Sequence, residues 1–275
     1  MTDRYAVIGN PIAHSKSPLI HTRFALSTGQ DLEYTKLEST PEGFVAAVHA
    51  FRDGGGRGLN VTAPFKLQAF ELGTDKRERA RIAGAANGMK FEADGRIVVD
   101  NFDGVGLAND IECNLGMPLK GKRVLMLGAG GAARGALVEF LARGLTELVI
   151  ANRTVATAQA LAQQFAGHGR LTACGYADLA HESGFDLVLN GTSASLKAEL
   201  PPVPVGVFAN AALAYEMVYG RGLTPFLRLA QNAGAPRLAD GVGMLVEQAA
   251  EAFAWWRGVR PDTRPVIDQL TVPLV

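Results

Sequence analysis

The chain has 275 residues, and its 27 Lys and Arg side chains equal its 27 Asp and Glu side chains in number. This zero net charge argues against a protein whose main task is to coat nucleic acid or an anionic membrane. With 48% hydrophobic and 20% charged residues the composition is that of a globular protein, and the length favours two domains. The 32 glycines, clustered between apolar runs, indicate many tight turns.

Strands and helices alternate along the chain, which indicates an α/β fold with parallel strands joined by right-handed crossovers. In the first part we expect strands at 5–8, 32–37 and 59–61, a helix at 41–52, and a hairpin at 89–99 that turns at Asp94-Gly95. Another helix is expected to begin with Ser17 as its N-cap and Pro18 at its first position, and to end at Gly29.

The second part repeats the alternation with longer apolar strands. Helices are expected at 104–114, 131–143 and 155–165, and strands at 123–127, 147–151, 171–173, 186–189 and 214–218. The sequence RVLML at 123–127 is continuously apolar, as in a strand that is buried on both faces. The last strong helix, at 242–256, is so apolar that it must dock on another element, and it can return to the first domain.

Cysteine and histidine usage limits the chemistry. Cys113 and Cys174 form no CxxC motif, and the first residues, MTDRYAVIGNP, do not resemble a secretory leader. The chain contains no run of 18 apolar residues, so no membrane-spanning helix is predicted. We therefore expect a reducing, cytoplasmic compartment and neither a membrane nor a nucleic-acid partner. The five histidines have no metal-ligand spacing, so no metal site is expected.

The strongest local signal for a ligand is the segment Gly128-Ala129-Gly130-Gly131-Ala132-Ala133, which follows a strand and opens a helix. Glycines at these positions let the backbone approach a pyrophosphate at the helix N-terminus, although a glycine-rich helix start without a ligand is the alternative. The next strand ends at Asn152-Arg153-Thr154 without the carboxylate that is typical of NAD sites. Arg153 can pair with a 2′-phosphate, which favours NADP.

Two charged residues are candidates for acid–base chemistry. Lys66 follows a strand in the segment NVTAPFK, and a partly desolvated lysine can transfer protons. Asp103 lies in DNFDG and can orient Lys66 by its charge. From the spacing alone, a surface lysine and a helix-capping aspartate are the simpler alternatives.

Eight segments together resemble the shikimate/quinate dehydrogenase family, in the family's order and through nearly the whole chain. They are GNPIAHSKSPLIH (9–21), NVTAPFK (60–66), GAAN (84–87), DNFDGVG (100–106), GAGGAARG (128–135), NRT (152–154), YEMVYGRGLTPFL (215–227) and ADGVGMLVEQAA (239–250). The resemblance implies reversible NADP-linked interconversion of 3-dehydroshikimate and shikimate, on the route to chorismate and aromatic amino acids.

The resemblance also implies an architecture and a set of site residues. An N-terminal α/β substrate domain, completed by the C-terminal helix (1–103 plus 240–275), accompanies a Rossmann-type dinucleotide-binding domain (104–239), with the active site in the cleft between them. Lys66 and Asp103 are implied to be the catalytic pair. The implied substrate-binding residues are Ser15, Ser17, Asn60, Thr62, Asn87, Tyr219 and Gln248. The implied dinucleotide-binding residues are Gly128, Ala129, Gly130, Gly131, Ala132, Asn152, Arg153 and Thr154, with Met217 and Gly241 near the nicotinamide. We expect a monomer or a homodimer.

The chain departs from the family's pattern at positions that bear on specificity. The family usually has Thr where this chain has Phe102 and Gly88, and these changes can reshape one wall of the substrate pocket, unless Phe102 is a packed core residue. Many members have an Arg where this chain has Thr157, so use of NAD beside NADP stays open. A fourth departure, Gly191 for Ala, carries no clear consequence. The alternatives are a paralogue that oxidises quinate or another cyclic hydroxy acid, and a non-enzymatic dinucleotide-binding module.

Overall fold

The computed structural model describes residues 2–275, apart from the side chain of Ala132. The chain divides into two compact units, and the contacts within each are dense. Unit 1 comprises Met1–Gly106 and Val246–Val266, and unit 2 comprises Leu107–Leu245 and Ile267–Val275. In the described residues no helix is both long and apolar enough to cross a membrane.

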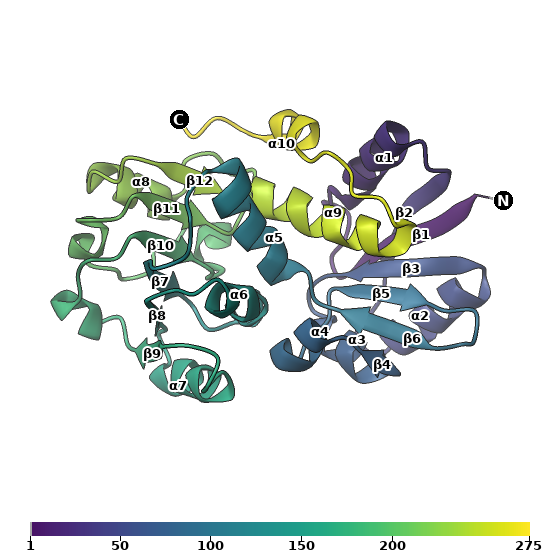
Figure 1. Cartoon of the computed structure of the whole chain (residues 1–275), viewed down its shortest axis with the longest axis horizontal. Coiled ribbons are helices and arrows are strands. Elements are labelled where there is room, and N and C mark those ends of the chain that lie inside the picture. Colours follow the sequence, from purple (N-terminus) through teal and green to yellow (C-terminus); the bar gives the residue numbers. More distant parts are fainter. Residues whose placement is uncertain (1) are drawn as a thin grey trace. The chain divides into compact units, whose positions relative to one another are not determined.

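Unit 1 is built on a mixed sheet, which has six strands in the described residues, in the order β2-β1-β3-β5-β6-β4 (Figure 1). Strands β2, β1 and β3 are parallel, whereas β5 is antiparallel to both β3 and β6. The strand bounds are β1 (Asp3–Gly9), β2 (Leu32–Glu38), β3 (Gly56–Val61), β4 (Asp75–Lys76), β5 (Gly88–Phe91) and β6 (Ile97–Asp100). The helices are α1 (Ser17–Thr28), α2 (Phe44–Asp53), α3 (Lys66–Leu72) and α4 (Glu78–Ala83).

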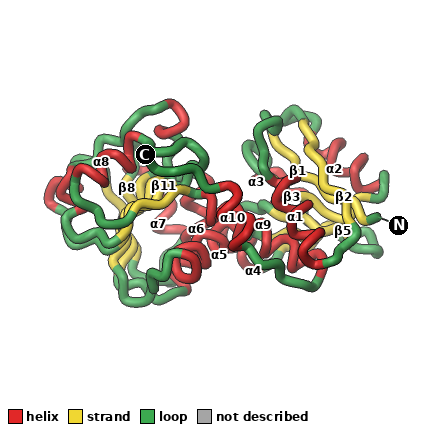
Figure 2. The backbone as a smooth tube through the Cα atoms, turned by 90° about the horizontal axis from the view of Figure 1, so that it is seen from above, coloured by secondary structure: helices red, strands yellow, loops and turns green. Residues whose placement is uncertain are grey.

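The sheet of unit 1 is covered on both faces, as the tube view of its strands and helices illustrates (Figure 2). One core joins the sheet to α2, α3 and α4 through residues such as Phe44, Ala69 and Ala80. A second core contains Tyr5, Val7 and Tyr34 from the strands together with Ala252 and Trp256 from the helix α9 (Val242–Arg257). The expected return of the last strong helix is therefore confirmed for its residues in unit 1.

Unit 2 contains a parallel sheet, of six strands among the described residues, in the order β12-β11-β10-β7-β8-β9. The strand bounds are β7 (Arg123–Leu127), β8 (Glu147–Ala151), β9 (Leu171–Cys174), β10 (Leu187–Asn190), β11 (Leu213–Glu216) and β12 (Leu238–Asp240). Crossover elements include α6 (Gly131–Ala142), α7 (Val155–Gln164) and α8 (Pro225–Asn232), and α5 (Asp103–Asn109) and α10 (Arg264–Leu270) lie where the chain passes between units. The predicted Rossmann-like parallel sheet is confirmed.

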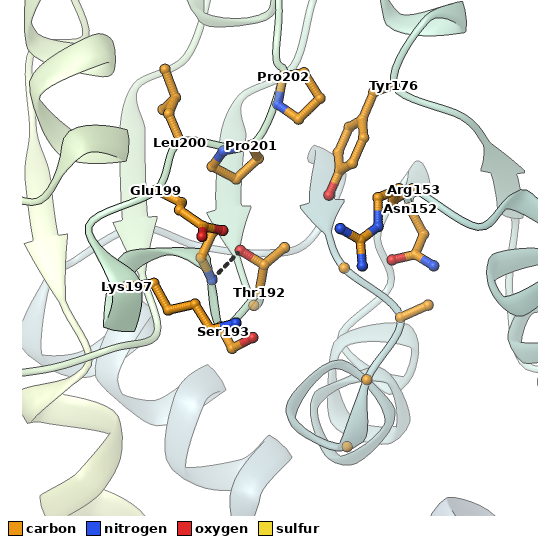
Figure 3. Close-up of a pocket in the computed structure, with 16 residues that line it drawn as sticks. Asn152, Arg153, Tyr176, Thr192, Ser193, Lys197, Glu199, Leu200, Pro201 and Pro202 are labelled. Atoms are coloured by element: carbon orange, nitrogen blue, oxygen red, sulfur yellow. Dashed lines mark hydrogen bonds between the residues drawn. The ribbon is translucent and has the colours of Figure 1, made fainter.

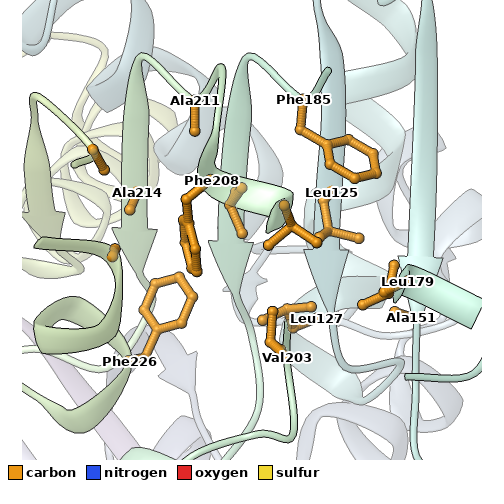
Figure 4. Close-up of a cluster of buried hydrophobic side chains, with 14 of the residues drawn as sticks. Leu125, Leu127, Ala151, Leu179, Phe185, Val203, Phe208, Ala211, Ala214 and Phe226 are labelled. Carbon is orange, nitrogen blue, oxygen red and sulfur yellow. The ribbon is translucent and has the colours of Figure 1, made fainter. Parts of the chain in front are cut away.

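Alternate residues of the central strands β10, β7 and β8 point to opposite faces, and all of them except Arg123 at the start of β7 are buried. Leu125 and Leu127 of β7 join Phe185, Phe208 and Phe226 in one core on a single face (Figure 4). Val124 and Met126, which alternate with them, are fully buried as well. Burial on both faces explains why RVLML predicted its strand to the residue.

The helix expected at 41–52 is α2 (Phe44–Asp53), and the strand expected at 214–218 is β11 (Leu213–Glu216), which leaves Met217 just after the strand. Two other expected elements also differ in detail. Ser17 is the first residue of α1 rather than its cap, because Lys16 occupies the N-cap position and makes no side-chain capping bond. The helix expected at 104–114 changes its hydrogen bonding after Asn109, where a five-residue π-helical turn (Asp110–Asn114) follows α5. Neither difference moves a predicted site residue out of its element or adjoining loop.

Phe102 and Gly88 form one packing unit in the second core of unit 1. The Phe102 side chain is 1% exposed, and a Cβ atom added at Gly88 would lie 2.4 Å from its Cε2 atom. The ring centroid lies 5.5 Å from that of Trp255 and 5.1 Å from the guanidinium carbon of Arg79. Arg79 is itself held by two hydrogen bonds to Asp100. The aromatic ring therefore fills the space that the missing side chain at position 88 leaves.

This packing predicts strong coupling between the two positions. Gly88→Thr alone should destabilise unit 1 by about 1–3 kcal/mol because the ring has no room to move. Phe102→Thr alone should cost about 3 kcal/mol by leaving a cavity. The double variant should lose much less than the sum, because each change makes room for the other. Urea unfolding, followed by tryptophan fluorescence, measures the free energy of unfolding of unit 1, where both tryptophans lie. If the loss in the double variant equals the sum of the two single losses, the proposed packing of Phe102 against Gly88 is wrong.

A buried histidine predicts acid sensitivity. His21 is fully buried, stacks on Tyr34 at 4.2 Å between ring centroids, and burial lowers its pKa to about 3; the side chain of Asn60 opposes this shift to a smaller extent. The unfolded chain, with a histidine pKa of about 6.5, binds one more proton below that pH. Stability is therefore unaffected by His21 above pH 6.5 and falls by about 2 kcal/mol between pH 6.5 and 5.

The substitution His21→Phe should flatten this pH dependence of urea unfolding. His181→Gln, at an exposed position, is the matched control and should leave the slope unchanged. An identical slope for the wild type and His21→Phe would show that His21 is not the titrating group.

Candidate active site

The predicted catalytic and substrate residues of unit 1 gather at one edge of its sheet. Strands β1 and β3 are parallel, and both end at this edge. Strand β5 is antiparallel to β3 and therefore begins there, and β6, which is antiparallel to β5, ends there. The segments at this edge carry Ser15 and Ser17 after β1, Thr62 and Lys66 after β3, Asn87 before β5, and Asp103 after β6. Sheet topology thus brings together residues that are far apart in the sequence.

An ion pair joins the two predicted catalytic residues. Lys66 Nζ donates to Asp103 Oδ2 at 2.5 Å. Asn87 Nδ2 donates to Asp103 Oδ1 at 2.8 Å and to Gln248 Oε1 at 3.3 Å. We call Lys66, Asp103, Asn87 and Gln248 the Lys66 cluster. Both carboxylate oxygens of Asp103 accept hydrogen bonds from side chains, so this carboxylate orients a lysine and does not act as the simple helix cap.

The backbone fixes the orientation of this cluster. Phe102 N donates to Asn87 Oδ1 at 2.8 Å, which directs the amide nitrogen of Asn87 toward Asp103. Asp103 N donates to Asn101 Oδ1 at 3.1 Å, and Asn101 Nδ2 donates to the carbonyl oxygen of Ala85 at 3.0 Å. Buried polar groups held in this way have little freedom to reorient.

The ammonium group of Lys66 has further N–H donors that can bind a ligand. Its side chain is 25% exposed, whereas that of Asp103 is only 8% exposed. An ammonium has three N–H donors, and within the described part of the chain only Asp103 accepts from Lys66 Nζ. A partly exposed ammonium, held by a buried carboxylate, can donate a proton to a ligand oxygen, and the neutral amine that results can accept one back.

A second group of polar side chains extends the Lys66 cluster along the sheet edge. Asn60 Nδ2 donates to the carbonyl oxygen of Asn87 at 3.4 Å, and Tyr34 Oη donates to Asn60 Oδ1 at 2.7 Å. Burial raises the pKa of Tyr34 well above its usual value, and a hydrogen bond with Ser17 lowers it to a smaller extent. Ser15 Oγ donates to Ser17 Oγ at 3.2 Å. Sequence reasoning missed Tyr34, which has no motif around it.

The remaining predicted residues near the substrate and nicotinamide belong to unit 2. Met217 N donates to the carbonyl oxygen of Asn190 at 2.9 Å, directly after β11. A Cβ atom added at Gly241 would lie 2.2 Å from the carbonyl oxygen of Met217, so this close approach requires glycine. Burial raises the pKa of Tyr219, which follows β11. The ligand roles of Met217, Gly241 and Tyr219 stay predictions.

Unit 2 contains a cavity of about 470 Å³ at the carboxyl ends of its strands, where parallel sheets bind ligands. We call it the glycine-loop cavity. Its lining residues are Gly128, Ala129, Gly130, Gly131, Asn152, Arg153, Tyr176, Gly191, Thr192, Ser193, Ala194, Lys197, Glu199, Leu200, Pro201 and Pro202 (Figure 3). Thr154, Met217 and Gly241 do not line it, and the prediction for Ala132 falls on a side chain outside the described part of the structure.

The glycine loop fits a bound pyrophosphate. Gly128 has φ 97°, and a Cβ atom there would lie 3.0 Å from Thr192 Cγ2, so the chain's own packing requires this glycine. At Gly130 and Gly131 an added Cβ atom would meet nothing within 4 Å. The open space beside these two glycines suits a ligand that approaches the backbone closely at the start of α6.

The turn after β8 carries the positive charge that a 2′-phosphate needs. β8 ends at Ala151, and Asn152 and Arg153, which line the cavity, follow it. Asn152 Nδ2 donates to the carbonyl oxygen of Thr154 at 2.9 Å, which holds this turn. The residues present therefore fit a dinucleotide with a 2′-phosphate better than one without it.

Sequence reasoning missed several other residues that line the glycine-loop cavity. Tyr176 follows β9, and Thr192, Ser193, Lys197 and Glu199 follow β10. The sequence contained part of this signal, because all parallel strands of a sheet end at one edge, so the segments after β9 and β10 lie at the same edge as the glycine loop. No motif marked which of their side chains would face the cavity.

Three family models match successive parts of the chain. They describe the shikimate dehydrogenase substrate binding domain (residues 7–89), shikimate / quinate 5-dehydrogenase (111–198) and the shikimate 5'-dehydrogenase C-terminal domain (241–271).

Individual relatives agree over nearly the full length. The shikimate dehydrogenase (NADP(+)) of Nitrosospira multiformis is 56% identical over 270 residues, which cover 98% of each chain. An Ael1 enzyme from Pseudomonas putida has a solved structure with a TM-score of 0.96 and 63% identity over all of both chains. The shikimate 5-dehydrogenase from Thermus thermophilus, solved with NADP(H) and shikimate, has a TM-score of 0.85 and 32% identity over 97% of this chain and 98% of its own. The chain therefore belongs to the shikimate dehydrogenase family.

Proposed function

We propose that this protein catalyses the reversible NADP-dependent reduction of 3-dehydroshikimate to shikimate, in chorismate and aromatic amino acid biosynthesis. The observation that carries the proposal is the Lys66–Asp103 ion pair, held by Asn87 at the edge of the unit 1 sheet. The relative from Nitrosospira multiformis is named for this activity, and it is similar to the present chain from end to end.

Oxidation of a secondary alcohol removes a hydride from carbon and a proton from oxygen, and the nicotinamide of a bound dinucleotide supplies the hydride chemistry. The chain's own task is the proton. During reduction the ammonium of Lys66 donates this proton to the carbonyl oxygen and becomes a neutral amine, and during oxidation the neutral amine accepts the proton from the reacting hydroxyl. Asp103 holds the ammonium in register for this transfer, because its second oxygen is already fixed by Asn87.

The substrate is a polyhydroxy acid, and each of its buried polar groups needs a partner, since an unpaired one costs about 1–3 kcal/mol. We assign this binding to Ser15, Ser17, Asn60, Thr62, Asn87, Tyr219 and Gln248. The hydrogen-bond chain that links Tyr34, Asn60 and Asn87 supports a preorganised set of donors and acceptors in unit 1.

The burial of Phe102 bears on the choice of substrate. Its ring packs over Gly88 inside unit 1 and is 1% exposed, so the two departures from the family's pattern compensate each other in the core. This supports shikimate as the substrate and weakens the reason to expect a paralogue that oxidises quinate.

We further propose that residues 1–103 plus 240–275 bind the substrate and residues 104–239 bind NADP. The gathering of Lys66, Asn87 and Asp103 in unit 1, and of the glycine-loop cavity in unit 2, supports this division. A cytoplasmic location and a monomer or homodimer complete the proposal; the free thiols Cys113 and Cys174 suit a reducing compartment.

A steady-state assay with shikimate and quinate, each with NADP+ and NAD+, tests the proposal. We expect the highest kcat/KM for shikimate with NADP+, because Arg153 can pair with the 2′-phosphate. A preference for quinate would establish the paralogue instead. Tight binding of NADP+ without turnover of either acid would establish a non-enzymatic module.

The variant Lys66→Ala tests the proposed proton carrier. Its kcat should fall by about 10²–10⁴, the usual contribution of a general acid–base group, while its dissociation constant for NADP+ stays the same because Lys66 does not line the glycine-loop cavity. Lys120→Ala, at an exposed position in unit 2, is the control and should keep full activity. Undiminished turnover in Lys66→Ala would contradict the assignment.

A further inference from the structure

We infer that Lys197 binds the pyrophosphate of the dinucleotide. The inference rests on the proposed use of NADP. Thr157, an exposed and uncharged residue of α7, does not line the glycine-loop cavity. Lys197 does line the cavity.

The sheet order places two cations on opposite sides of the glycine loop. Strand β7 leads into this loop, and β10 and β8 are its two neighbours in the sheet. Arg153 follows β8, whereas Lys197 follows β10. Figure 3 shows their side chains on opposite walls of the cavity.

A buried hydrogen-bond network directs Lys197 toward the cavity. Lys197 ends a short 3-10 helix (Ala194–Lys197), and Ser195 on this helix is buried and donates to the carboxylate of Glu216. The carboxylate also accepts from Asn190 Nδ2 at 2.9 Å and from Thr224 Oγ1 at 3.1 Å. With Ser195 fixed inward, the helix presents Lys197 on its outer side.

The chain reverses directly after Lys197. Ala198 has φ 56°, a left-handed conformation that residues other than glycine rarely adopt. This reversal brings Glu199 and Leu200 back along the same cavity. The segment is thus bent sharply around the cavity wall that carries Lys197.

The charges on this wall are available to a ligand. Among the described residues, neither Lys197 nor Glu199 has an ion-pair or side-chain hydrogen-bond partner. Lys197 can therefore contact a phosphate without losing another interaction. The carboxylate of Glu199 would oppose such a ligand, so without Lys197 this wall of the cavity would repel the pyrophosphate.

The position favours the pyrophosphate over the 2′-phosphate. In a Rossmann-type unit the pyrophosphate lies on the glycine loop, and the adenosine ribose lies toward the end of the next strand along the chain, here β8. The segment after β10 is in close contact with the glycine loop, since an added Cβ atom at Gly128 would lie 3.0 Å from Thr192 Cγ2. Lys197 is therefore on the pyrophosphate side, and the 2′-phosphate is left to Arg153.

Calorimetric titration of the full chain with NADP+ and with NAD+, without substrate, tests the inference. Lys197→Ala should raise both dissociation constants by a similar factor, about threefold to tenfold, because both nucleotides carry the pyrophosphate. Arg153→Ala, the matched comparison, should raise the constant for NADP+ and leave that for NAD+ unchanged. Lys197→Arg, which keeps the charge, should bind both nucleotides like the wild type.

Two results would overturn the inference: unchanged constants for both nucleotides in Lys197→Ala, or a change for NADP+ alone, which would place Lys197 on the 2′-phosphate. The titration is independent of turnover. If the expected binding pattern appears but the wild type does not oxidise shikimate, the proposed activity fails and the inference about Lys197 stands.

Discussion

The ion pair between Lys66 and Asp103 is the interaction on which the candidate active site depends. A carboxylate that is only 8% exposed needs compensation for its lost hydration, and Asp103 obtains it from Lys66 on one oxygen and Asn87 on the other. Asn87 is in turn fixed by the backbone N–H of Phe102. A single buried charge thus links the ends of three strands into one rigid edge of the sheet, and the more exposed ammonium is the part of the pair left open to a ligand.

The glycine-loop cavity of unit 2 is organised differently. There the chain leaves donors and cations unpaired: the backbone beside Gly130 and Gly131 is open, and Lys197 makes no ion pair among the described residues. A rigid network nevertheless lies beneath it, because Glu216 is fully buried and binds Asn190, Ser195 and Thr224. Burial raises the pKa of Glu216, while these hydrogen bonds oppose the rise. A rigid hydrogen-bond network around Glu216, together with an unpaired cation that lines the cavity, suits the binding of a polyanionic ligand.

Sequence patterns predicted the elements that burial determines most strongly. Strands β7 and β8 were predicted to the residue because their apolar runs are continuous, and the hairpin of β5 and β6 because Asp94-Gly95 marks its turn. The short helices α3 and α4 were not predicted. In α3, for example, only Ala69 is fully buried and Leu67 is exposed, so its seven residues show no apolar periodicity.

The site was predictable where a motif carried it. Lys66 and Asp103 are 37 residues apart, and their spacing alone favoured a surface lysine and a helix cap; the resemblance to a family led to the pairing that the structure shows. The contact between Gly88 and Phe102 was not predictable, because it depends on strand register and on the packing of α9. Lys197 was missed because nothing in its neighbouring sequence signals a ligand.

A crystal structure of this protein with shikimate and NADP+ tests the central claim most directly, because it shows which atoms meet the reacting hydroxyl. The account predicts that Lys66 Nζ and a carboxylate oxygen of Asp103 both lie within about 3 Å of that hydroxyl oxygen. It also predicts that Asn87 still donates to the other carboxylate oxygen. A complex in which the hydroxyl is held by other groups, with Lys66 directed away from it, would contradict the account.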